Sequence, residues 1–167
     1  MMGLHVRAAL AALSLALIAF AAALAPAGAD SRAMRLPVHM VKLAADTATG
    51  QKFFSIEVAD EASEQERGLM FREEMPDDRG MLFDLGRTRQ ASFWMENTPM
   101  PLDLLFIGED GRVRAILPGQ PYSRAPISPG VPVRFVLELK EGTSAKNGIA
   151  PGDRLRHPVI DAVAGSN

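Results

Sequence analysis

The residues best suited to chemistry lie between positions 93 and 103, in the string Phe-Trp-Met-Glu-Asn-Thr-Pro-Met-Pro-Leu-Asp. Trp94, the only tryptophan, could form a wall of a pocket in which Asn97, Thr98 and Asp103 anchor the polar groups of a ligand. A sugar or a peptide fragment would suit such a surface. The same short polar side chains can instead hydrogen-bond their own backbone and build a loop. The string therefore has two interpretations, a ligand site and a structural loop.

Methionine is the second chemical feature, because thioether sulfur is a soft ligand for Cu(I). Met70, Met81 and Met95 are the best candidates for such a site, since they lie in the motifs described below. Methionine also fills hydrophobic cores, and each of these three has leucine or phenylalanine close by in the sequence. Packing is therefore the stronger expectation, and a Cu(I) site is an alternative.

Arg72 is a third candidate. Its guanidinium could hold a ligand carboxylate through two parallel hydrogen bonds. It could equally form an ion pair with Asp103 or with the neighbouring Glu73 and so orient a loop.

Signatures of catalysis are weak. The chain has no His-Glu-x-x-His zinc motif, no Gly-x-Ser-x-Gly elbow and no phosphate loop. Asp84, Asp103 and Glu138 could supply a carboxyl pair for hydrolysis, but no spacing brings them together. Alternation along residues 133–139 predicts that Glu138 faces away from the apolar side of its strand. A hydrolase that uses Asp103 is therefore a further alternative behind a non-catalytic protein.

Composition excludes several classes of protein. The 167 residues include 18 Lys and Arg against 20 Asp and Glu, a net charge of -2, and this balance argues against a dedicated nucleic-acid binder. The chain is 47% hydrophobic and 23% charged, which is typical of a folded domain. The absence of cysteine excludes disulfides, thiolate metal sites and a cysteine nucleophile.

Residues 1–29 have the pattern of a secretory signal peptide. Arg7 precedes an apolar run over 8–25, and the small-residue triplet 27–29 follows as a cleavage site. A permanent membrane anchor is the alternative, but the run is alanine-rich and at the lower edge of spanning length. We therefore expect a periplasmic or secreted mature protein that starts at Asp30 and keeps no membrane anchor.

The elements that must position the candidate residues are mostly short strands. A helix is expected near 61–68, capped by Asp60 or Ser63 and stopped by Gly68. Asp110-Gly111 predicts a hairpin turn. Strands are expected at 38–43, 52–58, 81–85, 91–95, 104–107, 113–116 and 133–139, with a last one after the turn at 150–153.

Together these elements predict a mainly β fold, a single-domain β-sandwich or barrel with one short helix. Residues 30–50 would form a leader with a candidate first strand, 51–160 the β domain, and 161–167 a C-terminal tail.

The order of motifs in this domain closely resembles the DUF192 family of small, often exported bacterial and archaeal proteins. The resemblance covers about residues 53–157, and its most specific part is the string from Trp94 to Asp103. It rests further on Gly68-Leu69-Met70-Phe71-Arg72, Gly80-Met81-Leu82-Phe83 and Gly148-Ile149-Ala150-Pro151-Gly152-Asp153. The resemblance implies a single mainly β domain and no agreed biochemical activity.

We therefore expect an exported, non-catalytic accessory protein of the cell envelope that binds a small ligand or an envelope protein. The expected site comprises Arg72, Trp94, Asn97, Thr98 and Asp103, with the three methionines beneath or beside it. No cofactor is expected other than Cu(I) in the alternative, and no nucleic-acid partner.

Overall fold

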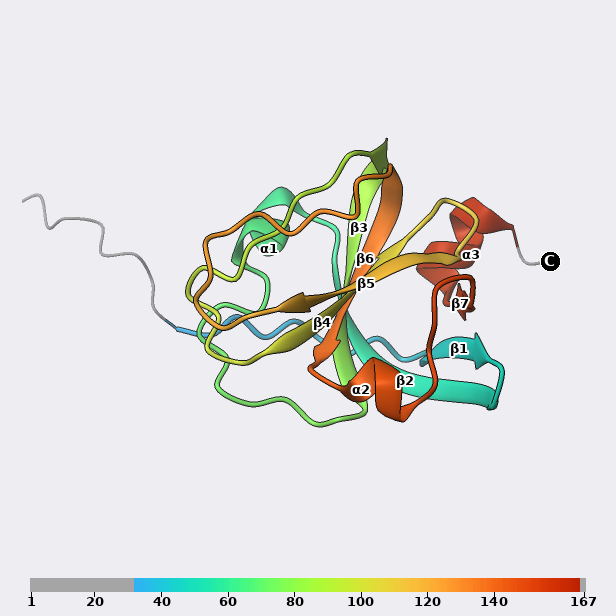
Figure 1. The fold of residues 1–167 in the computed structure, drawn as a ribbon, viewed down its shortest axis with the longest axis horizontal. Helices are drawn as coiled ribbons and strands as arrows, with labels where there is room; N and C mark the ends of the chain where they lie inside the picture. The colour runs from blue at the N-terminus through green and yellow to red at the C-terminus, as the bar shows by residue number, and fades with distance from the viewer. Residues whose placement is uncertain (1–31, 166–167) are drawn as a thin grey trace, which may run out of the picture. The chain divides into compact units, whose positions relative to one another are not determined.

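Seven strands form one curled, half-barrel sheet in the computed structural model, which describes residues 32–165 (Figure 1). The strand order is β5-β4-β6-β3-β2-β1-β7. Neighbouring strands are antiparallel except β2 and β3, which run parallel and are joined by a long connection that contains α1. The strands are β1 Leu43–Thr47, β2 Gly50–Ala59, β3 Arg79–Arg89, β4 Leu102–Ile107, β5 Val113–Gly119, β6 Val133–Lys140 and β7 Arg154–Arg156. The mainly β class is confirmed.

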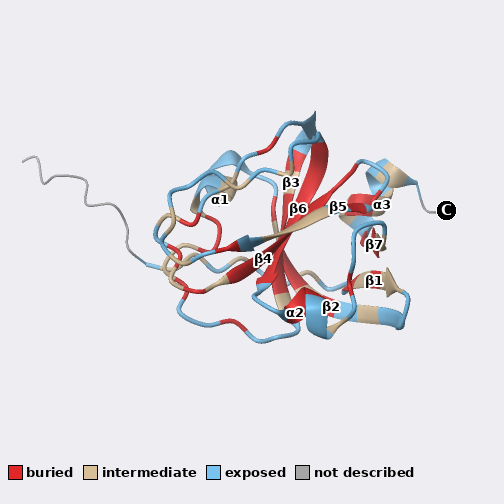
Figure 2. Ribbon diagram, in the orientation of Figure 1, coloured by how far each residue is buried: buried red, intermediate tan, exposed pale blue. Residues whose placement is uncertain are grey.

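Both faces of the sheet carry a hydrophobic cluster. Along β6, Phe135, Leu137 and Leu139 belong to one cluster, and Val136 belongs to the other. Consequently β6 is buried from Val133 to Leu139, and the central strands are buried along most of their length (Figure 2). The predicted alternation is present, but it does not separate an apolar face from a solvent face. Glu138 does lie on the opposite face from Phe135, Leu137 and Leu139, as expected, but that face is also covered by apolar side chains, and Glu138 is buried.

The helix expected near 61–68 is confirmed as α1, Ala62–Arg67. Its N-cap is Glu61 rather than Asp60 or Ser63, and the backbone N–H of Glu61 donates to Oε2 of Glu64 at 3.2 Å. Gly68 ends the helix with a positive φ of 47°. A Cβ at this position would lie 3.3 Å from the Phe83 ring, so glycine also permits the close approach to β3.

Other boundaries differ from the sequence expectations. The first strand lies at Leu43–Thr47 rather than 38–43, since β1 pairs with both β2 and β7 and only Val38 bridges β2. Residues 91–95 form no strand apart from a bridge between Phe93 and Ile127. Two helices were not expected: α2, Thr143–Lys146, and α3, Pro158–Ala164, which includes most of the expected tail. The proposed signal peptide lies outside the described residues.

The long connections gather at the end of the sheet where α1 lies (Figure 1). The segments after α1, after β3 and after β5 are joined there by backbone hydrogen bonds. The N–H of Phe71 donates to the carbonyl of Asn97 at 2.7 Å, and that of Tyr122 to the carbonyl of Thr98 at 3.0 Å. The residues from Trp94 to Thr98 therefore lie between two other loops. Between residues 32 and 165, no helix has the length and apolar character needed to span a bilayer.

Candidate functional site

Two glutamates occupy one row across the face of the sheet that carries Val136, which we call the second face. Glu57 of β2 lies opposite Met81 of β3, Met81 lies opposite Glu138 of β6, and Glu138 lies opposite Leu104 of β4. Two strand spacings separate the glutamates, which places their Cα atoms about 10 Å apart. Both side chains are buried, so each needs a compensating partner to remain ionised at low cost.

Glu57 has that partner. Arg72 donates two hydrogen bonds to its carboxylate, from Nη1 at 2.7 Å and from Nη2 at 2.5 Å. The backbone N–H of Leu36 donates to Glu57 Oε2 at 2.8 Å, and Nε of Arg72 donates to the carbonyl of Met34 at 2.8 Å. Arg72 is only 1% exposed. The expected ion pair with Asp103 or Glu73 was wrong, and Arg72 instead fastens the leader segment to the sheet.

Glu138 has no such partner. Its side chain is 5% exposed, and within residues 32–165 no hydrogen bond or ion pair joins its carboxyl group to another residue. Burial raises the pKa of Glu138 from 4.5 to about 8, and the charge of Arg72 opposes the rise only in part. The carboxyl is therefore largely protonated at neutral pH.

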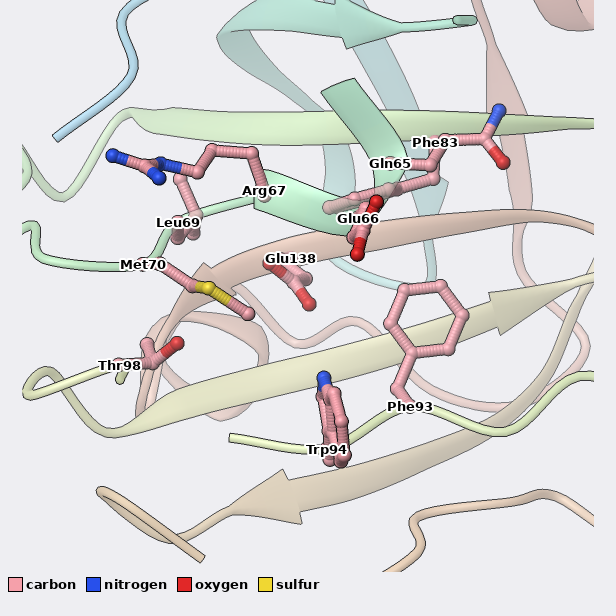
Figure 3. A pocket seen from close by; sticks show the side chains of 11 residues that line it. Gln65, Glu66, Arg67, Leu69, Met70, Phe83, Phe93, Trp94, Thr98 and Glu138 are labelled. Carbon is pink, nitrogen blue, oxygen red and sulfur yellow. The ribbon is translucent and has the colours of Figure 1, made fainter. Parts of the chain in front are cut away.

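The carboxyl of Glu138 lies at the floor of a pocket between α1 and the segment 93–98 (Figure 3). We call this the Glu138 pocket. Its cavity volume is about 40 Å³, and it opens toward the neighbouring surface. Two further hollows, of about 150 and 250 Å³, share Phe93 and Trp94 with it. Trp94 is 51% exposed and forms the wall that all three spaces have in common. The lining comprises Gln65, Glu66, Arg67, Gly68, Leu69, Met70, Phe83, Phe93, Trp94, Thr98 and Glu138.

Backbone strain is concentrated around this pocket. Phe71, Asn97 and Tyr122 are the residues other than glycine with positive φ between residues 32 and 165, at 62°, 56° and 60°. The hydrogen bonds that join the three loops involve Phe71, Asn97 and Tyr122 themselves. A left-handed conformation is costly for bulky side chains and persists where the surroundings enforce it, often at binding sites. The loops around the pocket are therefore held in one arrangement at some cost.

The predicted polar anchors divide between two places. Thr98 lines the pocket and is buried, and its hydroxyl donates to the carbonyl of Glu96 at 3.3 Å. Asn97 lies beside the pocket, with Nδ2 4.0 Å from the sulfur of Met70. Their roles in binding remain predictions.

Asp103 lies elsewhere. Its register opposite Leu139 places it on the other face of the sheet from Glu138, since Leu104 is the residue opposite Glu138. Its carboxylate accepts from the backbone N–H of Gly142 at 3.2 Å, the N–H of Ser144 at 2.9 Å and the Ser144 hydroxyl at 2.5 Å. Asp103 thus holds the start of α2 in place. The structure does not bring Asp103 and Glu138 together.

The three candidate methionines are also separated by their surroundings. Met81 and Met95 are buried in the cluster on the second face, whereas Met70 is half-buried and lines the pocket. Among residues 32–165, no group of three or more His, Asp or Glu side chains could hold a metal ion. The Cu(I) site remains a prediction.

Sequence reasoning missed Glu138 as a residue that lines a pocket. The sequence offered little signal, because Arg134 and Lys140 alternate with Val136 and Glu138 along the same face of the strand. The loops that cover this face are remote in sequence, so the alternation alone indicated solvent exposure.

Two solved structures are similar to this chain. A candidate transcription regulator from Sinorhizobium meliloti 1021 is 42% identical, with a TM-score of 0.69, over 74% of this chain and 97% of that one. A protein of unknown function from Novosphingobium aromaticivorans DSM 12444 is 36% identical, with a TM-score of 0.69, over 76% of this chain and 96% of that one. No curated protein matches the chain.

The DUF192 family, described as Uncharacterized ACR, matches residues 44–157. This range includes both glutamates of the row, the strained loops and Trp94. The match spans more than half of the chain and confirms the resemblance seen in the motifs, so the chain belongs to the DUF192 family.

Proposed function

We propose that this protein is an exported, non-catalytic binding protein of the cell envelope, and that a small ligand enters the Glu138 pocket beside Trp94. The observation that carries the proposal is the buried carboxyl of Glu138, which has no partner among the described residues and lies at the floor of a pocket. Buried polar groups without partners are rare in proteins, because each costs about 1–3 kcal/mol. A ligand that supplies the missing partner explains why a carboxyl group occupies this buried position.

The walls of the pocket support this assignment. A ligand site commonly combines apolar and aromatic walls with a few convergent polar groups. Trp94, Phe93 and Leu69 supply apolar surface, and Thr98 and Glu138 supply polar atoms. The hydrogen bonds between the loops support it as well, since those of Phe93 and Met95 hold the backbone on either side of Trp94 before any ligand arrives.

Location in the envelope is supported by the N-terminal pattern of charge, apolar run and small-residue cleavage site. Fractionation of producing cells, with sequencing of the mature N-terminus, tests it. We expect a periplasmic or secreted protein that begins at Asp30. A full-length protein in the cytoplasm would contradict export.

A nucleic-acid partner is not part of the proposal, although the Sinorhizobium protein is described as a candidate transcription regulator. The net charge of -2 gives this chain no excess of cations with which to neutralise phosphates.

Binding can be tested with a library of small fragments and proton–nitrogen NMR spectra. Because Trp94 is the only tryptophan, the spectrum has one indole N–H signal, which reports on the Glu138 pocket and the two hollows beside it. We expect fragments to shift this signal in the wild type. As a matched pair, Trp94→Ala should abolish binding, detected on the backbone amide signals of the pocket, while Phe53→Ala, on β2 outside the pocket and 53% exposed, should retain it. A library that shifts no signal from the pocket residues would contradict the proposal.

A further inference from the structure

The Glu138 pocket combines a buried carboxyl group with aromatic and thioether walls. Phe83, Phe93 and Trp94 contribute rings, and Met70 contributes a sulfur atom near the floor (Figure 3). We propose that the ligand carries an organic ammonium group, which pairs with the Glu138 carboxylate while its hydrocarbon part lies along Trp94 and Met70. This inference rests on the binding function proposed above and names the chemical class of the ligand.

The charges around the pocket favour a cation. Glu66 lies at the rim, and its carboxylate points toward the space between Glu138 and Phe93 (Figure 3). Arg67 also lines the pocket, but its guanidinium points away, lies 5.1 Å from the centre of the Phe71 ring and donates to the carbonyl of Arg32. The charge of Arg72 is taken up by Glu57.

Gln65, the remaining polar side chain of α1 in the lining, donates its amide to the carbonyl of Asp84 at 2.6 Å. The carboxyls of Glu66 and Glu138 are therefore the charged groups directed into the pocket from the described residues.

The walls favour an alkylammonium over a bare metal ion. The apolar stem of an amine gains from contact with Leu69 and Met70, whereas a metal ion requires several oxygen, nitrogen or sulfur ligands in a fixed geometry. A carboxylate at the floor and rings at the sides suit a charged head on an apolar stem.

Protonation of Glu138 decides between ammonium and neutral ligands. An ammonium pairs with the ionised carboxylate and must displace its proton, so its binding strengthens as pH rises. A neutral or anionic ligand that accepts a hydrogen bond needs the protonated carboxyl, so its binding weakens at high pH. With a pKa of about 8, the ionised fraction of Glu138 rises from about 1% at pH 6 to about 90% at pH 9.

The test compares three probes of matched size, n-butylammonium, n-butanol and butyrate, by titration of the Trp94 fluorescence between pH 6 and pH 9. Alkylammonium groups keep their charge over this range, since their pKa resembles the value of about 10.4 for lysine. We expect the affinity for n-butylammonium to rise about 90-fold between pH 6 and pH 9, with weaker binding of the other two probes.

Two variants test whether binding depends on the carboxyl of Glu138 or on the overall charge of the protein. Glu138→Gln should remove both the binding of n-butylammonium and its dependence on pH. Glu73→Gln, which neutralises an exposed glutamate outside the lining, should leave both unchanged. Circular dichroism establishes that each variant is folded, and the pH dependence of the wild type tests the proposal without any variant.

The two proposals fail in different ways. If n-butanol or butyrate binds better than n-butylammonium at pH 9, or if affinity for the amine falls as pH rises, the ammonium class is wrong while the pocket still binds ligands. The ammonium class is also wrong if library fragments shift the Trp94 indole signal but n-butylammonium does not bind. If neither the fragments nor the three probes affect Trp94, the proposed function itself fails.

Discussion

Replacement of Glu138 by glutamine is expected to stabilise the protein at neutral and alkaline pH. The carboxyl titrates at about 8 in the folded protein and at about 4.5 when burial is lost. The folded state therefore binds the proton more tightly than the unfolded state, and wild-type stability falls as pH rises between these two values. Glutamine has nearly the same shape and does not titrate, so the variant lacks this loss.

The magnitude follows from the pKa difference. Each pH unit between the two values costs the wild type about 1.4 kcal/mol, so the full loss reaches about 5 kcal/mol at pH 8 and above. At pH 7 it is about 3 kcal/mol. Below pH 4.5 the carboxyl is protonated in both the folded and the unfolded state, and the titration contributes nothing. Any cost of burying the glutamine amide is the same at every pH, so the pH-dependent part of the difference isolates the carboxyl.

Urea unfolding of wild type and Glu138→Gln at pH 5, 7 and 9, followed by circular dichroism, measures the effect. The free energy of unfolding of the variant, relative to that of the wild type, should increase from pH 5 to pH 9. A difference in stability that does not change with pH would refute the reasoning, because it would show that burial does not shift the titration of Glu138.

Glu57→Gln is the matched control from the same row of the sheet. It breaks a paired carboxylate and leaves Arg72 buried without its counter-charge, which should cost about 3–5 kcal/mol at pH 7. Neutralising two buried glutamates of one row is thus expected to have opposite effects on stability.

Three further predictions concern residues outside the pocket floor. Burial, reinforced by the neighbouring His39, lowers the pKa of His157 to about 4, so its contribution to stability should be lost as pH falls from about 6.5 toward 4. The variant His157→Asn keeps a hydrogen-bond acceptor at the N-cap of α3, so its melting temperature should fall less than that of the wild type between pH 6.5 and pH 4. An equal fall in both proteins would show that His157 does not cause the loss. Asp103→Ala should cost about 2–4 kcal/mol in urea unfolding, since it removes three hydrogen bonds to residues 142–144, and a neutral result would mean that α2 does not depend on this carboxylate. Gly68→Ala should lower the melting temperature, because a side chain there is strained at positive φ and approaches the Phe83 ring at 3.3 Å, so a variant as stable as the wild type would argue against the tight turn.

Local features of the fold could be predicted from the sequence. The Asp110-Gly111 turn does join β4 to β5, and the alternating run at 133–139 is β6. Both signals depend only on neighbouring residues and need no knowledge of distant contacts. The position of β1 could not be predicted in this way. It is set by pairing with β2 and with β7, which follows more than one hundred residues later.

The candidate site shows the same division between local and remote contacts. Trp94 was identified by its type, and the structure places it at a pocket. Asp103 was expected either to bind a ligand or to bond its own loop. It instead bonds residues 142–144, about forty positions later. The partner of Arg72 is Glu57 of β2, which precedes α1 in the sequence. Both candidate partners, Asp103 and Glu73, follow α1.

The contrast between Glu57 and Glu138 is the strongest physical argument for a binding site. Both are buried on one face of one sheet, so the fold tolerates a carboxylate there when a guanidinium accompanies it. An apolar residue at position 138 would remove the cost of an unpaired carboxyl, and replacement of buried charged groups by apolar residues is often neutral or stabilising in proteins. Glu138 instead remains without a partner among the described residues, at a place on this face where a pocket reaches the strand. A group that lowers stability and is accessible to a ligand is typical of binding sites, where proteins often lose stability for the sake of function.

A ligand cation that pairs with Glu138 would supply the counter-charge that Arg72 provides for Glu57. Binding should therefore raise the stability of the folded protein most at pH 8 and above.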